Sequence, residues 1–323
     1  MHGDDASRAG SEAAFVDPGL AGFLDMLRTA DQAPFNEISV SEARTRFREN
    51  APALQVPAPA IAEVRRITLR GGACELSAKV YVPRRRPRSA GCVFFHGGGW
   101  VIGDADIYDP VASRLAAHAD GVVVSVDYRL APEHRFPAAF DDAVAAFGDV
   151  CARADELGLD PSRIAIAGES AGGNIAAAAA NALASSAAPP RLQVLIYPAT
   201  RLCWQSPSRI RFARDHFLTD EDIGYFEQSY LGDLTLADDP RASPLLAITP
   251  SSPAPAIIAT AGFDPLLDQG VAYGERLEAA GAPATLLHYP DLIHGFALMT
   301  GVSPAARDAL DEIGAAMGAA LSS

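Results

Sequence analysis

The sequence predicts an α/β fold in which helices cover both faces of a mostly parallel central sheet. From residue 92 onward, short apolar segments alternate with segments of helical length. The apolar segments, such as Val122–Val126, are almost free of polar residues, which is typical of strands buried on both faces. With 323 residues, 49% of them hydrophobic, the chain can bury a large core. Together these observations indicate a parallel sheet, whose functional groups gather where the strands end.

The N-terminal part of the chain lies outside this alternation. Apolar residues at helical spacing predict a helix over 18–30, and a second, more polar helix is expected over 39–49, with Ser41 as a possible cap. The Pro-rich segment 51–60 cannot form a regular helix. We therefore expect residues 1–55 to form N-terminal cap helices, or a lid, beside a catalytic domain of residues 56–323. The first twelve residues are expected to be disordered.

A hairpin is predicted at the start of the catalytic domain. Strands over 64–69 and 76–82 flank Gly71-Gly72. The basic run 84–88 that follows is interpreted as a solvated turn, because the whole chain carries a net charge of −14. The same charge argues against nucleic-acid binding, since a phosphate backbone would be repelled.

The alternating region then predicts strands and helices in turn. The expected strands are 92–95, 122–126, 164–167, 192–197, 257–260 and 284–288, and the expected helices are 108–119, 137–154, 174–184, 270–280 and 304–321. Residues 201–237 break the rhythm with a long aromatic-rich insertion. We interpret about 200–240 as a cap insertion over the strand ends, with a helical excursion packed on the side as the alternative.

The segment Gly168-Glu169-Ser170-Ala171-Gly172-Gly173 follows a predicted strand and precedes a predicted helix. Strand, sharp turn and helix are the context in which G-x-S-x-G forms a nucleophile elbow. The alternative is a structural Gly-rich helix start. In the first interpretation, Ser170 is a catalytic nucleophile at a helix N-terminus, where developing negative charge is stabilised.

Three consecutive glycines follow the 92–95 strand, in His96-Gly97-Gly98-Gly99-Trp100. Such a loop exposes backbone N–H groups, which acyl transfer needs for the oxyanion of its tetrahedral intermediate. We predict an oxyanion hole of Gly97, Gly98 and Ala171, with His96 orienting the loop. A flexible loop or a phosphate cradle is the alternative, although the G-K-[ST] of a P-loop is absent.

An acid and a base are expected after later strands. Asp264 follows the 257–260 strand in a turn fixed by a proline, whereas Asp268 is interpreted as a cap of the next helix. His294 lies in the loop after the last strand, whereas His288 falls within that strand. The order Ser170, Asp264, His294 is that of an α/β-hydrolase triad.

These motifs resemble the hormone-sensitive-lipase-like family, the bacterial type IV carboxylesterases. The resemblance covers about residue 80 to the C-terminus and rests on H-G-G-G-W at 96–100, D-Y-R-L-A-P-E-H-R-F-P-A-A-F-D-D-A at 127–143, G-E-S-A-G-G-N at 168–174, S-P-L-L-A at 243–247, G-F-D-P-L-L-D-Q-G at 262–270 and H-G-F at 294–296. It implies an α/β-hydrolase core with a helical cap, no metal, no cofactor, and esters of short to medium acyl chains as substrates. It also implies that Arg129, Glu133 and Asp141 or Asp142 pin loops beneath the site.

The expected function is therefore serine carboxylester hydrolysis through an acyl-enzyme intermediate. An amidase or deacetylase with the same triad is one alternative, and a non-catalytic small-molecule receptor is another. Candidate substrate-binding residues are Trp100, Trp204, Phe212, Phe217 and Phe296, with ordinary packing as the alternative.

The expected partner is a small-molecule ester, and the family suggests a possible homodimer. The first twelve residues lack the features of a secretory signal, and no apolar run reaches the length of a membrane span. The four scattered cysteines are expected to be reduced. We expect a cytoplasmic protein without membrane insertion.

Overall fold

The central sheet of the protein has eight strands in the order β1-β2-β4-β3-β5-β6-β7-β8. The structure is a computed structural model that describes residues 15–30, 33–84, 88–247 and 252–322. Strand β2 is antiparallel to both of its neighbours, and the remaining adjacent pairs are parallel. The strands are β1 (Glu63–Arg70), β2 (Glu75–Val82), β3 (Ser89–Phe95), β4 (Val122–Val126), β5 (Leu159–Glu169), β6 (Gln193–Ile196), β7 (Ala256–Phe263) and β8 (Ala284–Ile293).

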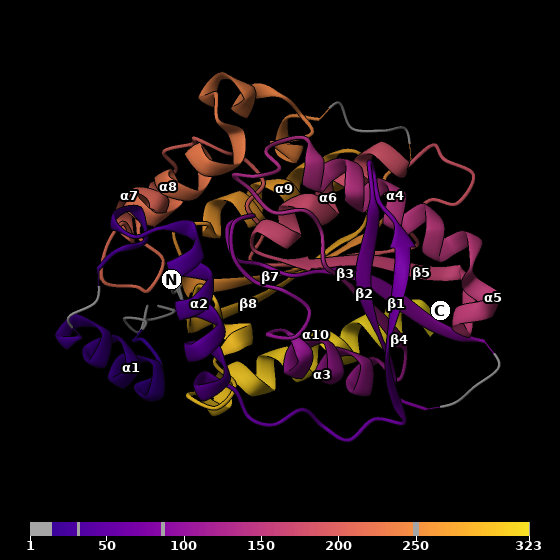
Figure 1. Cartoon of the computed structure of the whole chain (residues 1–323), viewed down its shortest axis with the longest axis horizontal. Coiled ribbons are helices and arrows are strands. Elements are labelled where there is room, and N and C mark those ends of the chain that lie inside the picture. Colours follow the sequence, from indigo (N-terminus) through magenta and orange to yellow (C-terminus); the bar gives the residue numbers. More distant parts are fainter. Residues whose placement is uncertain (1–14, 31–32, 85–87, 248–251, 323) are drawn as a thin grey trace, which may run out of the picture.

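Helices cover both faces of this sheet (Figure 1). Helices α3 (Asp109–Ala119) and α10 (Pro304–Ser322) pack on one face, and their buried residues form one hydrophobic cluster with that side of the strands. Helices α4 (Ala138–Ala152), α6 (Ala171–Leu183) and α9 (Leu267–Ala279) pack on the other face, in a second cluster. The short α5 (Ala154–Leu157) follows α4. The predicted α/β fold, with its mostly parallel sheet, is confirmed.

Several predicted strands are longer in the structure than in the sequence analysis, β5 and β8 by the most residues. Strand β5 begins at Leu159, and β8 continues through Pro290 to Ile293. A proline is compatible with β8 because this strand lies at the edge of the sheet, where one side of the backbone needs no hydrogen-bond partner. His294 is therefore the first residue of the loop that follows the strand directly.

The N-terminal helices and the insertion lie together at one end of the sheet (Figure 1). These elements are α1 (Pro18–Thr29), η1 (Phe35–Glu37), α2 (Val40–Asn50) and η2 (Ala51–Leu54), and then α7 (Pro207–Arg211), α8 (Asp220–Leu231) and η3 (Leu234–Asp238). The rings of Phe23 and Phe217 are 5.9 Å apart, and those of Phe35 and Phe226 are 5.6 Å apart. The cap of α2 is Ser39, which accepts a hydrogen bond from Glu42 N–H, so the prediction of Ser41 was wrong.

The remaining short elements are η4 (Pro244–Leu246) and η5 (Phe296–Leu298). The predicted disorder of residues 1–12 and the centre of the basic run, residues 85–87, fall outside the described residues. In the part of the chain that the structure describes, no helix has the length and apolar character needed to cross a membrane. All four cysteines lie among the described residues and are free.

Candidate active site

Ser170 occupies a tight turn between β5 and α6. Its backbone has φ 54° and ψ −116°, a conformation that residues other than glycine rarely adopt. A Cβ atom on Gly168 would lie 2.2 Å from the carbonyl oxygen of Gly172, and one on Gly172 would lie 2.0 Å from that of Phe95. Both positions therefore require glycine, because backbone atoms cannot move aside. The turn leaves Ser170 partly exposed at the start of the helix.

Three predicted side chains form a continuous hydrogen-bonded series. Ser170 Oγ is 2.9 Å from His294 Nε2, and His294 Nδ1 is 2.8 Å from Asp264 Oδ2. Strands β7 and β8 pair Phe263 with Ile293, so the next residue of each strand, Asp264 and His294, emerges at the same place. Asp264 is fully buried, and its other oxygen accepts a hydrogen bond from Leu266 N–H at 2.7 Å.

The environment of His294 favours its protonated form. Burial alone would lower its pKa, but the charge of Asp264 and the hydrogen bond to it outweigh burial. The charge of Glu169 adds to this effect, and the pKa of His294 is raised above its usual value. The imidazolium that would form on removal of a proton from Ser170 is thus stabilised by two buried carboxylates.

Asp268, the alternative to Asp264 as the acid, has a different role from the one predicted. Asp268 Oδ2 accepts a hydrogen bond from Ser208 N–H at 2.7 Å, at the start of α7. Among the described residues, no side chain caps α9, so the interpretation of Asp268 as the cap of its own helix was wrong. In return, Ser208 Oγ donates to the Pro265 carbonyl and accepts from Asp268 N–H. Ser208 and Asp268 therefore attach the insertion to the turn that carries Asp264.

The other two histidines near these motifs make different contacts. His288 stays within β8 and is 3.0 Å from Thr260 Oγ1. His96 is buried, its Nδ1 is 2.7 Å from the Gly97 carbonyl oxygen, and burial lowers its pKa. Its ring stacks on Tyr128, whose hydroxyl donates to the His96 carbonyl at 2.9 Å. His96 thus contacts the glycine loop and not Ser170.

The glycine loop after β3 has a conformation that side chains would prevent. Gly98 and Gly99 have φ values of 106° and 59°. A Cβ on Gly97 would lie 1.6 Å from Glu169 Oε2, and the Gly97 backbone makes a hydrogen bond to this carboxylate. The Gly97 N–H thus already has a hydrogen-bond acceptor. The Gly98 carbonyl accepts hydrogen bonds from the N–H groups of Val101 and Ile102 in the following turn.

Helix α2 is attached to this loop through Arg44. Its guanidinium donates to the carbonyl oxygens of Val101 at 2.9 Å and Ala131 at 3.0 Å. It also forms a two-pronged ion pair with Glu133, at 2.8 and 2.7 Å. Sequence reasoning missed Arg44, because two of its partners are backbone atoms that no motif reveals.

The polar residues expected beneath the site form a second anchored group. Arg129 pairs with Asp142, at 2.8 Å between Nη2 and Oδ1, and Asp142 is fully buried. Asp142 also accepts a hydrogen bond from Gly72 N–H at 2.9 Å, which ties the β1–β2 hairpin to α4. Of the two aspartates left open by the sequence, Asp142 is the one that pairs with Arg129.

Two of the five predicted pocket residues have exposed surface. Phe217 is 38% exposed, and a Cβ on Gly295, the residue after His294, would lie 3.0 Å from its ring. Phe217 therefore lies beside the triad. Trp204 is half-buried in the insertion.

The other three predicted pocket residues are buried among aromatic neighbours, which favours ordinary packing. Trp100 stacks on Tyr230 with the ring centroids 4.5 Å apart. Phe212 packs against Phe263, the residue before Asp264, at 5.7 Å. Phe296 is fully buried and packs against Tyr197 and Tyr289.

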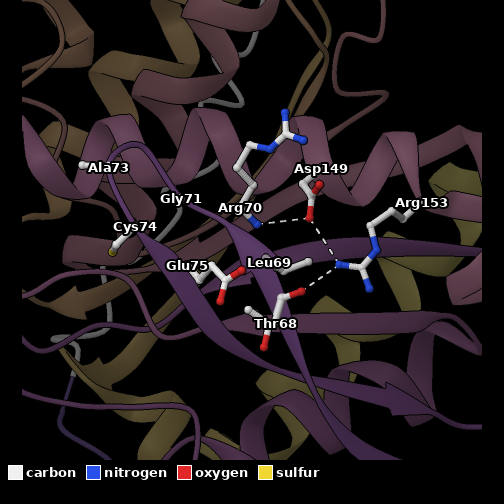
Figure 2. Close-up of a pocket in the computed structure, with 9 residues that line it drawn as sticks. All are labelled: Thr68, Leu69, Arg70, Gly71, Ala73, Cys74, Glu75, Asp149 and Arg153. Atoms are coloured by element: carbon white, nitrogen blue, oxygen red, sulfur yellow. Dashed lines mark hydrogen bonds and ion pairs between the residues drawn. The ribbon is translucent and has the colours of Figure 1, made fainter.

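A surface cavity of about 510 Å³ lies elsewhere, beside the β1–β2 hairpin (Figure 2). Within it, Asp149 accepts hydrogen bonds from the backbone N–H of Arg70 at 3.1 Å and from the Arg153 side chain at 3.3 Å, and Arg153 also donates to the Thr68 carbonyl. None of its lining residues belongs to the triad or the glycine loop. Over the described residues, no group of three or more His, Cys, Asp or Glu side chains could hold a metal ion.

Comparison with known proteins places this geometry in a family. A family model described as "alpha/beta hydrolase fold" matches residues 92–298. The carboxylic ester hydrolase LipN of Mycobacterium tuberculosis is 43% identical over 75% of this chain and 66% of its own length. The ethyl acetate hydrolase of Pseudomonas putida is 37% identical over 91% of this chain and 96% of its own.

A solved esterase structure supports the same family assignment. The ester-hydrolase EH1AB1 from the metagenome of Lake Arreo superposes with a TM-score of 0.92 at 36% identity, over 96% of this chain and 100% of that one. The predicted resemblance is confirmed: the chain belongs to the hormone-sensitive-lipase-like carboxylesterases of the α/β-hydrolase fold.

Proposed function

We propose that Ser170, His294 and Asp264 are the nucleophile, the base and the acid with which this carboxylesterase cleaves short- to medium-chain esters. The observation that carries the proposal is the hydrogen-bonded series from Ser170 Oγ through both nitrogens of His294 to Asp264, at 2.9 and 2.8 Å. Such a series is what nucleophilic catalysis by serine requires, because an unassisted hydroxyl is a weak nucleophile.

The chemistry then proceeds in two halves. His294 Nε2 takes the proton of Ser170 as Oγ attacks the ester carbonyl carbon, and the tetrahedral intermediate collapses when His294 returns the proton to the departing alcohol. Water repeats the cycle on the acyl-enzyme and releases the carboxylic acid. Asp264 stays ionised, holds the imidazole tautomer and stabilises the imidazolium.

The oxyanion is bound by backbone N–H groups. Of the predicted donors Gly97, Gly98 and Ala171, the hydrogen bond of Gly97 to Glu169 argues against the first. We assign the role to Gly98 and Ala171, with Gly99 as the further candidate from the same loop. The left-handed backbone of Gly98 and Gly99 supports this assignment, because neither residue carries a side chain of its own that could cover its N–H group.

The substrate is bound beneath a cap formed by the N-terminal helices within residues 1–55 and the insertion at about 200–240. The contact between Phe23 of α1 and Phe217 of the insertion supports this division, because it joins the two segments beside His294. Phe217 and Trp204 are the pocket residues that we retain. The name of the Pseudomonas putida relative, an ethyl acetate hydrolase, supports small acyl groups.

The decisive experiment replaces Ser170 with alanine. Turnover of p-nitrophenyl acetate and butyrate should fall to background, and a fluorophosphonate probe should label the wild-type protein but not the variant. Undiminished turnover by the folded variant would refute the proposal. A series of esters from acetate to palmitate, with anilides of the same acids, tests chain length and the preference for esters over amides.

We also propose a cytoplasmic location, and a homodimer of the kind that the family suggests. Fractionation of cells that produce the protein would test the first, and sedimentation equilibrium would test the second.

A further inference from the structure

Glu169, the residue directly before Ser170, is a buried carboxylate that the proposed mechanism does not use. Its side chain is 2% exposed at the end of β5. Three hydrogen-bond donors face it: the hydroxyl of Tyr108 at 3.0 Å, the hydroxyl of Tyr197, and the backbone N–H of Gly97. A buried carboxylate requires such donors, since an unpaired charge in the interior is strongly destabilising.

On one side, Glu169 fixes the glycine loop. The Gly97 backbone passes so close to the carboxylate that a Cβ on Gly97 would lie 1.6 Å from Oε2. The N–H of Gly97 donates to this carboxylate, and the next residue, Gly98, carries the N–H that we assign to the oxyanion. The position of Glu169 therefore sets where the oxyanion donor lies.

On the other side, Glu169 reaches the loop that carries His294. The hydroxyl oxygen of Tyr197 accepts a hydrogen bond from Ala297 N–H at 3.1 Å, so the hydroxyl proton is free to point to Glu169. The ring of Tyr197 also packs on the ring of His294, with centroids 4.7 Å apart. One carboxylate thus connects the glycine loop and the histidine loop.

We propose that Glu169 is a positioning residue that, as an ionised carboxylate, joins these two loops and stabilises the imidazolium formed at His294. The inference rests on the proposed function, because it assumes that His294 is the base.

The hydrogen-bond pattern favours the ionised form. All three partners donate, and a carboxylate only accepts. Burial, with the negative charge of Glu169, raises the pKa of Tyr108 and of Tyr197 well above the usual range, so both hydroxyls keep the protons that they donate. A glutamine at this position would point an amide N–H₂ toward donors, and at least one contact would be lost.

The titratable groups that face Glu169 and His294 can be named individually. His294 is faced by Asp264 and Glu169, and both raise its pKa. Burial raises the pKa of Glu169 above its usual value, although the charge of His294 and the three donors oppose this change. Two further titratable groups lie beside Tyr108 and the glycine loop: Tyr128, whose pKa is raised by burial, and His96, whose pKa is lowered by burial. Neither carries charge near neutral pH, so Glu169 and Asp264 dominate the field at His294.

The test compares Glu169→Gln and Glu169→Asp with Glu227→Gln, a matched change at a buried glutamate of the insertion that pairs with Arg209. In Glu169→Gln we expect kcat for p-nitrophenyl butyrate to fall about 10- to 100-fold, since a small displacement of catalytic groups has this effect. The acid limb of kcat/KM, which reports the base of the free enzyme, should move down by roughly 1 pH unit.

Glu169→Asp keeps the charge but withdraws it from Gly97. We expect its acid limb at the wild-type position, with kcat reduced by about 3- to 10-fold. Glu227→Gln should lower stability and leave the acid limb in place. Because the aspartate variant retains the charge, it provides the test if the glutamine variant does not fold.

Two results would overturn the inference: an unmoved acid limb in folded Glu169→Gln, or wild-type kcat across the pH range in Glu169→Asp. If Ser170→Ala is inactive while the Glu169 variants behave as wild type, only this inference fails. If Ser170→Ala stays active, the proposed function fails instead.

Discussion

Replacing Asp264 with asparagine tests the proposed acid by changing only one atom of its side chain. In the wild type, its two oxygens accept from His294 Nδ1 at 2.8 Å and from Leu266 N–H at 2.7 Å. Asparagine offers one acceptor oxygen to these two donors. If that oxygen faces Leu266, the amide N–H₂ faces Nδ1, and the imidazole must then carry its proton on Nε2. This tautomer cannot accept the proton of Ser170.

The expected loss is large because the wrong tautomer and the missing charge act together. The same substitution in serine proteases lowers kcat by about 10⁴-fold. We expect kcat for p-nitrophenyl butyrate to fall by about 10³- to 10⁴-fold, equivalent to about 4–5.5 kcal/mol of activation free energy. KM should change little, and circular dichroism should show a folded protein.

The matched control is Asp268→Asn, four residues further along the chain. Asp268 faces Ser208 N–H and not His294, so this variant should lose less than about 10-fold in kcat while its unfolding free energy falls by about 1 kcal/mol. A milder effect at Asp264 than at Asp268 would contradict the assignment of the acid.

Three further measurements address stability and pH. Gly148 is exposed in α4, and no atom lies within 4 Å of the place that a Cβ would take, so Gly148→Ala should raise the unfolding free energy by about 1 kcal/mol. Gly172→Ala should instead fail to give soluble protein, because its Cβ would collide with the Phe95 carbonyl. Glu227→Gln breaks a buried pair with Arg209 at 3.1 Å and should lower the urea unfolding free energy by about 3 kcal/mol; a loss below about 1 kcal/mol would contradict the reasoning. Because the pKa of His294 is raised, kcat/KM should decline with falling pH, with a midpoint above the usual histidine pKa of about 6.5. The protonated form of His294 also stabilises the fold, and this contribution to the unfolding free energy should disappear as the pH rises through the same midpoint.

The sequence was most informative where chemistry restricts the choice of residue. The elbow glycines, the triple-glycine loop and the position of His294 are restricted by close backbone approach or by reaction geometry, and their order along the chain is enough to identify them. The strands near the site could be predicted for a different reason: the side chains of β3 and β4 are buried, so their sequences are nearly all apolar.

Contacts between distant segments could not be predicted from the sequence. The pairing of Asp268 with Ser208 joins residues 60 positions apart, and that of Arg44 with Glu133 joins residues 89 positions apart. The hydrogen bond of Gly97 to Glu169 depends on the register of β3 with β5, which pairs Phe95 with Gly168. Periodicity describes which face of an element is buried but not which partner lies opposite.

The backbone of Ser170 has a consequence for any attempt to make this enzyme more durable. With φ at 54°, the residue is held in place by hydrogen bonds from its N–H to Ile196 and from Asn174 N–H to its carbonyl, each 2.9 Å long. Glycine would adopt this shape without strain and should relieve about 1–3 kcal/mol. An inert glycine form would then survive heating better than the working enzyme. Selection for heat resistance alone would remove the proposed nucleophile, so directed evolution of this protein has to screen for turnover and thermal survival together.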